Sequence, residues 1–328
     1  MNRLERLRSA IPALRPTRRL YTEVRGSGPT LVLLHGWALN LRVWDGLTAA
    51  LRDRFRIVAI DLPGHGRSEW LPERASLDDQ SADIHDTVSA IADRYSLLGW
   101  SLGGQIALRL AAAQQVVAAE QQGIAAKPRD TGAARAASID RLVLIATTPR
   151  FVTSPDWPYG TPPERLAQQA AGLRTDYRRT VSDFLELQVR GSADGAAALS
   201  QLRAALFAHG FPRERPDSRQ GMDGEARHKR IDAEPRHKEA EEPCLDALGR
   251  GLELLRDTDL RPLLGDITLP TLVIAGQYDR VTLPAASHAL ADALPNARYM
   301  EIRRAAHAPF LSHLPQLSTL LEDFLVHS

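Results

Sequence analysis

Short apolar runs alternate with longer stretches of helical periodicity along most of this chain. The runs consist mainly of Leu, Val and Ile, which is typical of parallel strands buried on both faces. They lie at residues 31–34, 56–60, 97–100, 141–146, 271–276 and 298–302. The alternation predicts an α/β fold around a mostly parallel central sheet, with ligands bound beyond the carboxyl ends of the strands.

A block of helical pattern separates the run at 141–146 from the run at 271–276. One helix is expected to begin at Pro162–Glu164, and another to cover Tyr177–Gln188. A helical block between two strands of one sheet predicts a cap inserted into an α/β core. The expected division is a core of residues 21–150 and 263–328 and a cap of residues 151–262.

Three segments fall outside this framework. Residues 1–20 are rich in arginine with one acid, Glu5, and predict a flexible basic tail, with a transit peptide as the alternative. Residues 113–138 extend a helix into a run of Ala, Gln and Gly and predict a surface insertion. Residues 213–242 carry balanced charges and few apolar anchors, so we expect disorder or an exposed charged helix there.

Composition narrows the functional classes. The 328 residues are 44% hydrophobic and 25% charged with a net charge of +1, which indicates a globular protein with no general attraction to nucleic acid or membranes. No apolar run approaches the roughly 18 residues needed to span a bilayer. A single cysteine, Cys244, excludes an internal disulfide and suits a reducing compartment. We therefore expect a cytoplasmic monomer. His228 and His237 lack neighbouring ligands, so no metal is expected.

The stretch around Ser101 carries the clearest chemical signal. Gly99-Trp100-Ser101-Leu102-Gly103 fits G-x-S-x-G between an apolar strand and an apolar helix. In a nucleophile elbow this sharp turn lifts the serine hydroxyl clear of the sheet, and the flanking glycines avoid steric clashes. The alternative is a glycine-rich loop that binds phosphate. The strand before and the helix after favour a nucleophile.

A serine nucleophile needs a base, and the base needs an orienting acid. In elbow hydrolases the acid and then the histidine follow the serine along the chain. His307 follows the last predicted strand among small neighbours, whereas His313 lies at a helix start. Asp279 follows the strand at 271–276 and is expected at the same sheet edge as Ser101. Three other acids fit less well: Asp266 precedes its strand, and Asp257 and Asp259 fall in the cap or its hinge.

Two backbone N–H groups are expected to form the oxyanion hole. One belongs to Leu102, directly after the nucleophile, and the other to Trp37, in the loop after the first long strand. The Trp37 ring is either a core aromatic or part of the pocket wall, and its place after His35-Gly36 favours the pocket.

Several stretches of the chain match a known family. L-V-L-L-H-G-W (31–37), L-G-W-S-L-G-G (98–104) and A-A-H-A-P-F (305–310) are shared widely among esterases. The cap stretches F-L-E-L-Q (184–188) and G-L-E-L-L-R-D-T-D-L-R (251–261) are more specific. By these stretches the chain resembles the α/β-hydrolase superfamily and, within it, the pimeloyl-acyl-carrier-protein methyl ester esterases of biotin synthesis. The basic tail and the two insertions depart from the compact family pattern.

The resemblance implies a serine carboxylesterase with Ser101, Asp279 and His307 as its triad and no cofactor. It also implies that an acyl carrier protein delivers the methyl ester. The implied substrate-site residues are Trp37, Leu102, Phe184, Leu185, Glu186, Leu187 and Gln188. The cap arginines that could meet an acidic carrier are Arg174, Arg178, Arg179 and Arg190. In a continuous helix, Arg174 and Arg178 would share one face; the alternative is a solvated surface.

Two other functions stay open on the sequence. The same fold and elbow serve broad short-chain carboxylesterases and lipase-like hydrolases. A ligand-binding receptor could also keep the triad with negligible turnover. Steady hydrolysis of a simple p-nitrophenyl ester would argue against the receptor.

Overall fold

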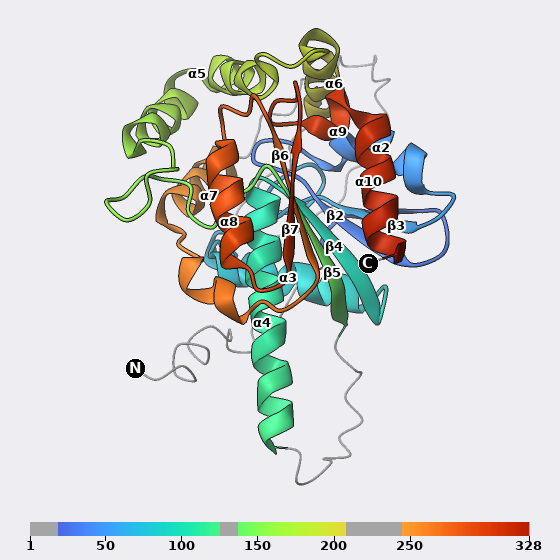
Figure 1. The fold of residues 1–328 in the computed structure, drawn as a ribbon. Coiled ribbons are helices and arrows are strands. Elements are labelled where there is room, and N and C mark those ends of the chain that lie inside the picture. The colour runs from blue at the N-terminus through green and yellow to red at the C-terminus, as the bar shows by residue number, and fades with distance from the viewer. Residues whose placement is uncertain (1–18, 125–136, 208–244, 328) are drawn as a thin grey trace, which may run out of the picture.

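A computed structural model of the chain describes residues 19–124, 137–207 and 245–327. Within these residues a seven-stranded sheet has the spatial order β1-β3-β2-β4-β5-β6-β7 (Figure 1). Neighbouring strands are parallel, except that β1 runs antiparallel to β3. The strands are β1 Thr22–Arg25, β2 Thr30–Leu34, β3 Arg56–Ile60, β4 Arg94–Trp100, β5 Ser138–Ile145, β6 Thr271–Gly276 and β7 Ala297–Ile302. The predicted mostly parallel α/β sheet is confirmed.

Helices cover both faces of the sheet (Figure 1). On one face α4 packs on α3 and β4, and α8 packs on β6 and β7; on the other, α10 packs on α2 and α9. The helices of the core are α2 Asp45–Leu51, α3 Leu77–Ser89, α4 Leu102–Ile124, α8 Pro284–Ala293, α9 Pro309–Ser312 and α10 Leu314–His327. The short 3₁₀ helices are η1 Leu41–Trp44, η2 Pro72–Arg74 and η3 Arg261–Asp266. Among these described helices none is both long and apolar enough to cross a membrane.

The sequence pattern explains why the central strands are fully buried. Every residue of β2 and β6 is buried, and so are the last four of β3 and of β4. A strand with helices on both faces has no solvent-facing side, so its apolar residues form a continuous run instead of alternating. The run at 56–60 and the run at 271–276 coincide with β3 and β6.

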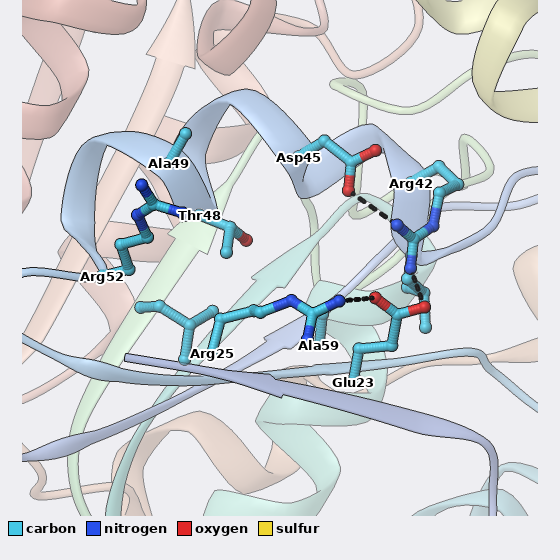
Figure 2. A pocket seen from close by; sticks show the side chains of 10 residues that line it. Glu23, Arg25, Arg42, Asp45, Thr48, Ala49, Arg52 and Ala59 are labelled. Atoms are coloured by element: carbon cyan, nitrogen blue, oxygen red, sulfur yellow. Dashed lines mark hydrogen bonds and ion pairs between the residues drawn. The ribbon is translucent and has the colours of Figure 1, made fainter. Parts of the chain in front are cut away.

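The edge strand β1 was not predicted, because Thr22–Arg25 contains one apolar residue and is only half-buried or exposed. It pairs with β3 through its backbone. Its charged side chains form ion pairs with each other and with η1 (Figure 2). Arg42 of η1 forms an ion pair with Glu23 and another, 3.2 Å long, with Asp45. Charged side chains of this kind also protect a sheet edge from pairing with other chains.

Between β5 and β6 the described residues form three further helices: α5 Pro163–Val189, α6 Gly195–Phe207 and α7 Leu245–Asp257. Helix α5 packs against both of the others and lies above the carboxyl end of the sheet (Figure 1). It is interrupted at Asp176, whose backbone is not helical (φ −156°, ψ 82°). The Asp176 carboxylate accepts the Arg179 N–H at 3.0 Å and so caps the second half. The predicted helix start at 162–164 and second helix at 177–188 match these two halves.

Where the chain leaves and re-enters the core, it is held by a cluster of ion pairs. Asp259 contacts Arg150 at 3.0 Å and Arg261 at 2.6 Å, and Arg261 also contacts Asp156 at 3.0 Å. Arg261 lies over the Trp157 ring, 5.6 Å from its centre. Ion pairs with Arg261 lower the pKa of Asp259. Asp259 thus links the segment that leaves the core, through Arg150, to the segment that returns to it, through Arg261.

Several expectations fall on residues that the structure does not describe. The basic tail at 1–20 lies outside the described residues except for its last two positions. So do the insertion at 213–242, with its two histidines, and Cys244. Of the insertion at 113–138, α4 occupies the first part through Ile124 and β5 begins at Ser138.

Candidate active site

Ser101 lies in a strained turn between β4 and α4. Its φ of 55° is in the left-handed region, which is uncommon for any residue other than glycine. Hydrogen bonds tie the turn to β5 and to the residues after it: the Ser101 N–H donates to the Ile145 carbonyl at 3.1 Å, and the Thr147 hydroxyl donates to the Ser101 carbonyl at 2.7 Å. A residue whose backbone persists in such a conformation is held there by its surroundings, and this strain is typical of functional sites.

The glycines around Ser101 make the turn possible. A Cβ atom at Gly99 would lie 2.4 Å from the Gly103 carbonyl oxygen. A Cβ atom at Gly103 would lie 2.5 Å from the carbonyl oxygens of Leu34 and His35. Because these neighbours are backbone atoms, they could move aside only if the sheet or the helix shifted. The predicted steric reason for the two glycines agrees with this geometry.

Asp279 and His307 are brought together from the ends of β6 and β7. The distance from His307 Nδ1 to Asp279 Oδ2 is 2.8 Å, and both side chains are buried. The other carboxylate oxygen, Oδ1, accepts the N–H groups of Val281 at 2.8 Å and Thr282 at 2.9 Å. Asp279 is therefore fixed as an acceptor for the Nδ1–H of the imidazole, which leaves Nε2 as the basic nitrogen.

No hydrogen bond joins His307 Nε2 to Ser101 in the described structure; the buried Nε2 atom has no hydrogen-bond partner there. The Trp100 ring, which precedes Ser101, has its centre 5.4 Å from that of His307. His307 thus lies beside the residue that directly precedes the nucleophile candidate. Hydrogen bonds between such groups are often long before substrate binds.

The expected oxyanion donors lie at the loop after β2 and at the start of α4. In the described part of the chain, neither the Trp37 N–H nor the Leu102 N–H donates to a protein acceptor. The loop is held by His35, whose Nδ1–H donates to the Gly36 carbonyl at 2.8 Å while Nε2 accepts the Leu62 N–H at 3.0 Å. Burial, together with nearby His65, lowers the pKa of His35 to about 3, so it bridges two loops as a neutral ring.

Comparison with known proteins agrees with this arrangement. The model of the alpha/beta hydrolase fold family matches residues 29–314. A pimeloyl-acyl-carrier-protein methyl ester esterase of Nitrosomonas europaea is 36% identical, over 89% of this chain and 94% of the relative. One of Stenotrophomonas maltophilia is 34% identical, over 93% of this chain and 96% of the relative.

The chain belongs to the pimeloyl-acyl-carrier-protein methyl ester esterase family. It is therefore a carboxylic ester hydrolase of the α/β-hydrolase fold. The fold is shared more widely. An esterase from Exiguobacterium antarcticum superposes with a TM-score of 0.70 at 19% identity, covering 93% of this chain and 95% of that one. An enol-lactonase from Burkholderia xenovorans superposes with a TM-score of 0.66 at 23% identity, covering 94% and 96%.

Of the cap residues implied by the resemblance, Phe184 and Gln188 lie next to core residues of this esterase. The Phe184 ring meets the Trp37 ring edge-on at 5.0 Å, and the Trp37 Nε1–H donates to the Leu248 carbonyl of α7 at 2.8 Å. The Gln188 carbonyl accepts the His307 N–H at 2.9 Å. Trp37 is thus buried between α5 and α7.

The other three residues of this cap stretch differ in exposure. Leu185 is fully buried and Leu187 is partly buried. Glu186 is exposed, and its carboxylate pairs with Arg203 of α6 at 2.9 Å. The Glu186 side chain therefore binds to α6.

The shared face expected for Arg174 and Arg178 required a continuous helix, and this condition is not met. The non-helical backbone at Asp176 lies between them, so the four-residue spacing no longer places them on one stripe. Arg174 borders a groove of about 750 Å³ between α5 and α7, whereas Arg178 lies over the Tyr177 ring at 5.5 Å. Arg179 is 3.8 Å from Asp183. Arg174, Arg178, Arg179 and Arg190 are all exposed.

Proposed function

We propose that this esterase hydrolyses the methyl ester of pimeloyl-acyl-carrier protein in biotin synthesis, releasing methanol and a free carboxylate. The observation that carries the proposal is the match to curated relatives of that name along about nine-tenths of both chains. Because the match extends through the cap region as well as the core, it reaches the part of the chain that distinguishes members of this fold. The fold alone would leave many ester substrates open.

In the proposed acylation step, Ser101 Oγ attacks the methyl ester carbonyl while His307 Nε2 takes the hydroxyl proton. The tetrahedral intermediate then collapses: the bond to the methoxy oxygen breaks, and the imidazolium gives its proton to the departing methanol. Asp279 supports the step because its carboxylate holds the Nδ1–H at 2.8 Å. The unpartnered Nε2 atom of His307 is consistent with a nitrogen reserved for this transfer.

In the proposed deacylation step, water attacks the acyl-serine ester, and His307 takes a proton from the water and returns it to Ser101. Both steps pass through an oxyanion. The uncommitted N–H groups of Trp37 and Leu102 are the proposed donors, and the amino end of α4 adds a favourable dipole. Neither step needs a cofactor. Within the described residues, no three His, Cys, Asp or Glu side chains are grouped to hold a metal ion.

We propose that residues 151–262 act as the cap over the acyl site and that an acyl carrier protein docks on it. The names of the relatives point to a carrier as the substrate's other half. Acyl carrier proteins are acidic, and α5 presents exposed arginines. Charged contacts of this kind raise the association rate and are screened by salt. Because helix α5 is interrupted at Asp176, between Arg174 and Arg178, the contribution of each arginine is tested separately.

The test compares two substrates with one enzyme. Methanol release from pimeloyl-carrier methyl ester is measured beside hydrolysis of p-nitrophenyl butyrate, for the wild type and for Ser101→Ala and His307→Ala. The proposal predicts a much higher kcat/KM on the carrier substrate, and loss of both activities in both variants. A wild type that hydrolyses the free ester but leaves the carrier-bound methyl ester intact would support a broad esterase instead. No turnover of either substrate would favour a receptor.

A further inference from the structure

The backbone of His307 is hydrogen-bonded on both sides. Its N–H donates to the Gln188 carbonyl at the end of α5, at 2.9 Å. Its carbonyl accepts the indole Nε1–H of Trp100 in β4, also at 2.9 Å. The first partner comes from the helix inserted between β5 and β6, and the second comes from the strand that carries Ser101. The loop that bears His307 thus contacts both the inserted helix α5 and the strand that carries Ser101.

A second backbone bond strengthens the connection to the inserted helices. The Ala193 N–H, in the turn between α5 and α6, donates to the Arg304 carbonyl at 3.2 Å. On the core side, the Tyr278 N–H, next to Asp279, donates to the Ala305 carbonyl at 2.8 Å. The 304–307 segment is therefore held between the α5–α6 turn and the loop that carries Asp279.

Trp100 is well placed to fix this segment. It is buried at the end of β4, and its ring packs against Phe310, with the ring centres 4.8 Å apart. Its only polar side-chain atom is the Nε1–H, and a buried indole N–H needs an acceptor. Because the ring is locked by its neighbours, the donor defines where the His307 carbonyl can lie.

We propose that Trp100 is a positioning residue for the catalytic base, and that the hydrogen bond from its indole to the His307 carbonyl, with the Gln188 carbonyl opposite, sets the distance from Nε2 to Ser101. The inference rests on the proposed role of His307. Asp279 fixes only the rotation and tautomer of the imidazole. The position of the ring follows from the backbone, and a misplacement of about 1 Å can cost about 100-fold in rate. Trp100 thus couples the nucleophile strand to the base.

The experiment removes the indole N–H and uses a neighbouring tryptophan as the control. Trp100→Phe loses the donor. Trp44→Phe makes the same change in the same aromatic cluster: Trp44 packs on Phe310 with ring centres 4.5 Å apart, and its buried Nε1 has no partner in the described structure. If Trp100→Phe does not fold, 3-benzothienylalanine introduced at position 100 by nonsense suppression keeps the bicyclic shape and lacks the donor.

Kinetics on p-nitrophenyl butyrate separate positioning from general damage. Trp100→Phe is expected to lower kcat by about 10- to 100-fold with KM changed less than about twofold. The rate of serine phosphonylation by a fluorophosphonate should fall in parallel, while the titratable fraction of sites stays unchanged. The low-field proton resonance of His307 Nδ1–H should shift. Trp44→Phe should leave all of these near wild type.

Equal kcat values for Trp100→Phe and Trp44→Phe would overturn the proposal, and so would a loss explained entirely by fewer titratable sites. These readouts use a small free ester, so they do not depend on the carrier as substrate. If the wild type does not hydrolyse the carrier-bound ester but Trp100→Phe lowers kcat on the free ester as expected, only the proposed substrate is contradicted. Full activity in His307→Ala would contradict both the role of His307 as the base and the positioning role of Trp100.

Discussion

His307 Nδ1 lies 2.8 Å from Asp279 Oδ2, although the two residues are 28 positions apart in the sequence. The contact is shielded from water, and the second oxygen of the carboxylate is held by two backbone N–H groups. A carboxylate fixed in this way can select one imidazole tautomer and stabilise the imidazolium that forms during the reaction. This geometry supports the proposed role of Asp279 as the orienting acid.

Replacing Asp279 by asparagine should preserve the shape of the side chain and remove its ability to fix the Nδ1–H tautomer. We expect kcat on p-nitrophenyl butyrate to fall on the order of 10³- to 10⁴-fold with little change in KM. The control is Asp266→Asn, because Asp266 ends η3 before β6, away from the carboxyl end of that strand. Comparable losses in the two variants would contradict the assignment of the acid.

The strands that hold the site could be predicted because each is buried on both faces and so leaves a continuous apolar run. Ser101, Asp279 and His307 could be nominated because each follows such a run at the same edge of a parallel sheet. β1 could not be predicted, since an edge strand needs only backbone pairing and its side chains meet solvent. The bond from Trp100 to the His307 carbonyl joins residues 207 positions apart and leaves no local pattern.

The cap arginines illustrate a different limit. The spacing of Arg174 and Arg178 predicts a shared face only if the helix between them is continuous. Asp176 ends one helical segment and caps the next through its own carboxylate. Aspartate is a common N-cap, but an aspartate inside a long helical pattern is just as often an exposed surface residue. The sequence alone therefore does not show whether Asp176 is an N-cap or an exposed residue inside a continuous helix.

Two glycines should respond oppositely to alanine. Gly103→Ala places a Cβ atom 2.5 Å from backbone oxygens of the β2 end, so we expect a loss of about 3 kcal/mol or more in the free energy of unfolding and loss of activity. Gly249→Ala, inside α7, meets nothing within 4 Å and should stabilise by up to about 1 kcal/mol through helix propensity. Urea denaturation measures both changes. A neutral Gly103→Ala would show that the elbow is less constrained than its contacts indicate.

The buried histidines predict a pH-dependent stability. Burial lowers the pKa of His65 to about 4 from 6.5, so the unfolded chain gains a proton in this window that the folded chain does not take. The free energy of unfolding should therefore fall as pH decreases from 6.5 toward 4, by about 1.4 kcal/mol per pH unit from His65. Burial raises the pKa of Asp61 to about 6, so this carboxyl acts in the opposite direction between pH 4 and 6.

His65→Asn isolates the contribution of that histidine. The free energy of unfolding is measured by urea denaturation from pH 7 to 4.5. Its slope against pH should be smaller than in the wild type by the contribution of about one proton. His288→Asn, at an exposed position on α8, is the matched control for replacing a histidine by asparagine. Equal slopes in wild type and His65→Asn would mean that the ring is protonated in the folded protein.

Charge reversal of the cap arginines tests carrier docking. Arg174→Glu and Arg178→Glu should each lower kcat/KM on the carrier-bound ester, by about threefold to tenfold at low ionic strength and less at high salt. Hydrolysis of p-nitrophenyl butyrate should be nearly unchanged. Arg298→Glu makes the same charge change at the exposed amino end of β7, the sheet edge opposite the site, and should affect neither substrate. Parallel losses on both substrates would indicate damage to the cap instead of lost docking.

The covalent intermediate gives the most direct test of the central claim, which is that Ser101 attacks the methyl ester end of carrier-bound pimelate. Rapid acid quench of enzyme and pimeloyl-carrier methyl ester, followed by intact-mass analysis and peptide mapping, identifies what is attached to Ser101. The account predicts an ester-linked conjugate of the enzyme with the whole carrier, with methanol released and no conjugate in Ser101→Ala. Free carrier thiol together with a methyl-pimeloyl group on Ser101 would show attack at the thioester, and methanol release by Ser101→Ala at the wild-type rate would exclude Ser101 as the nucleophile.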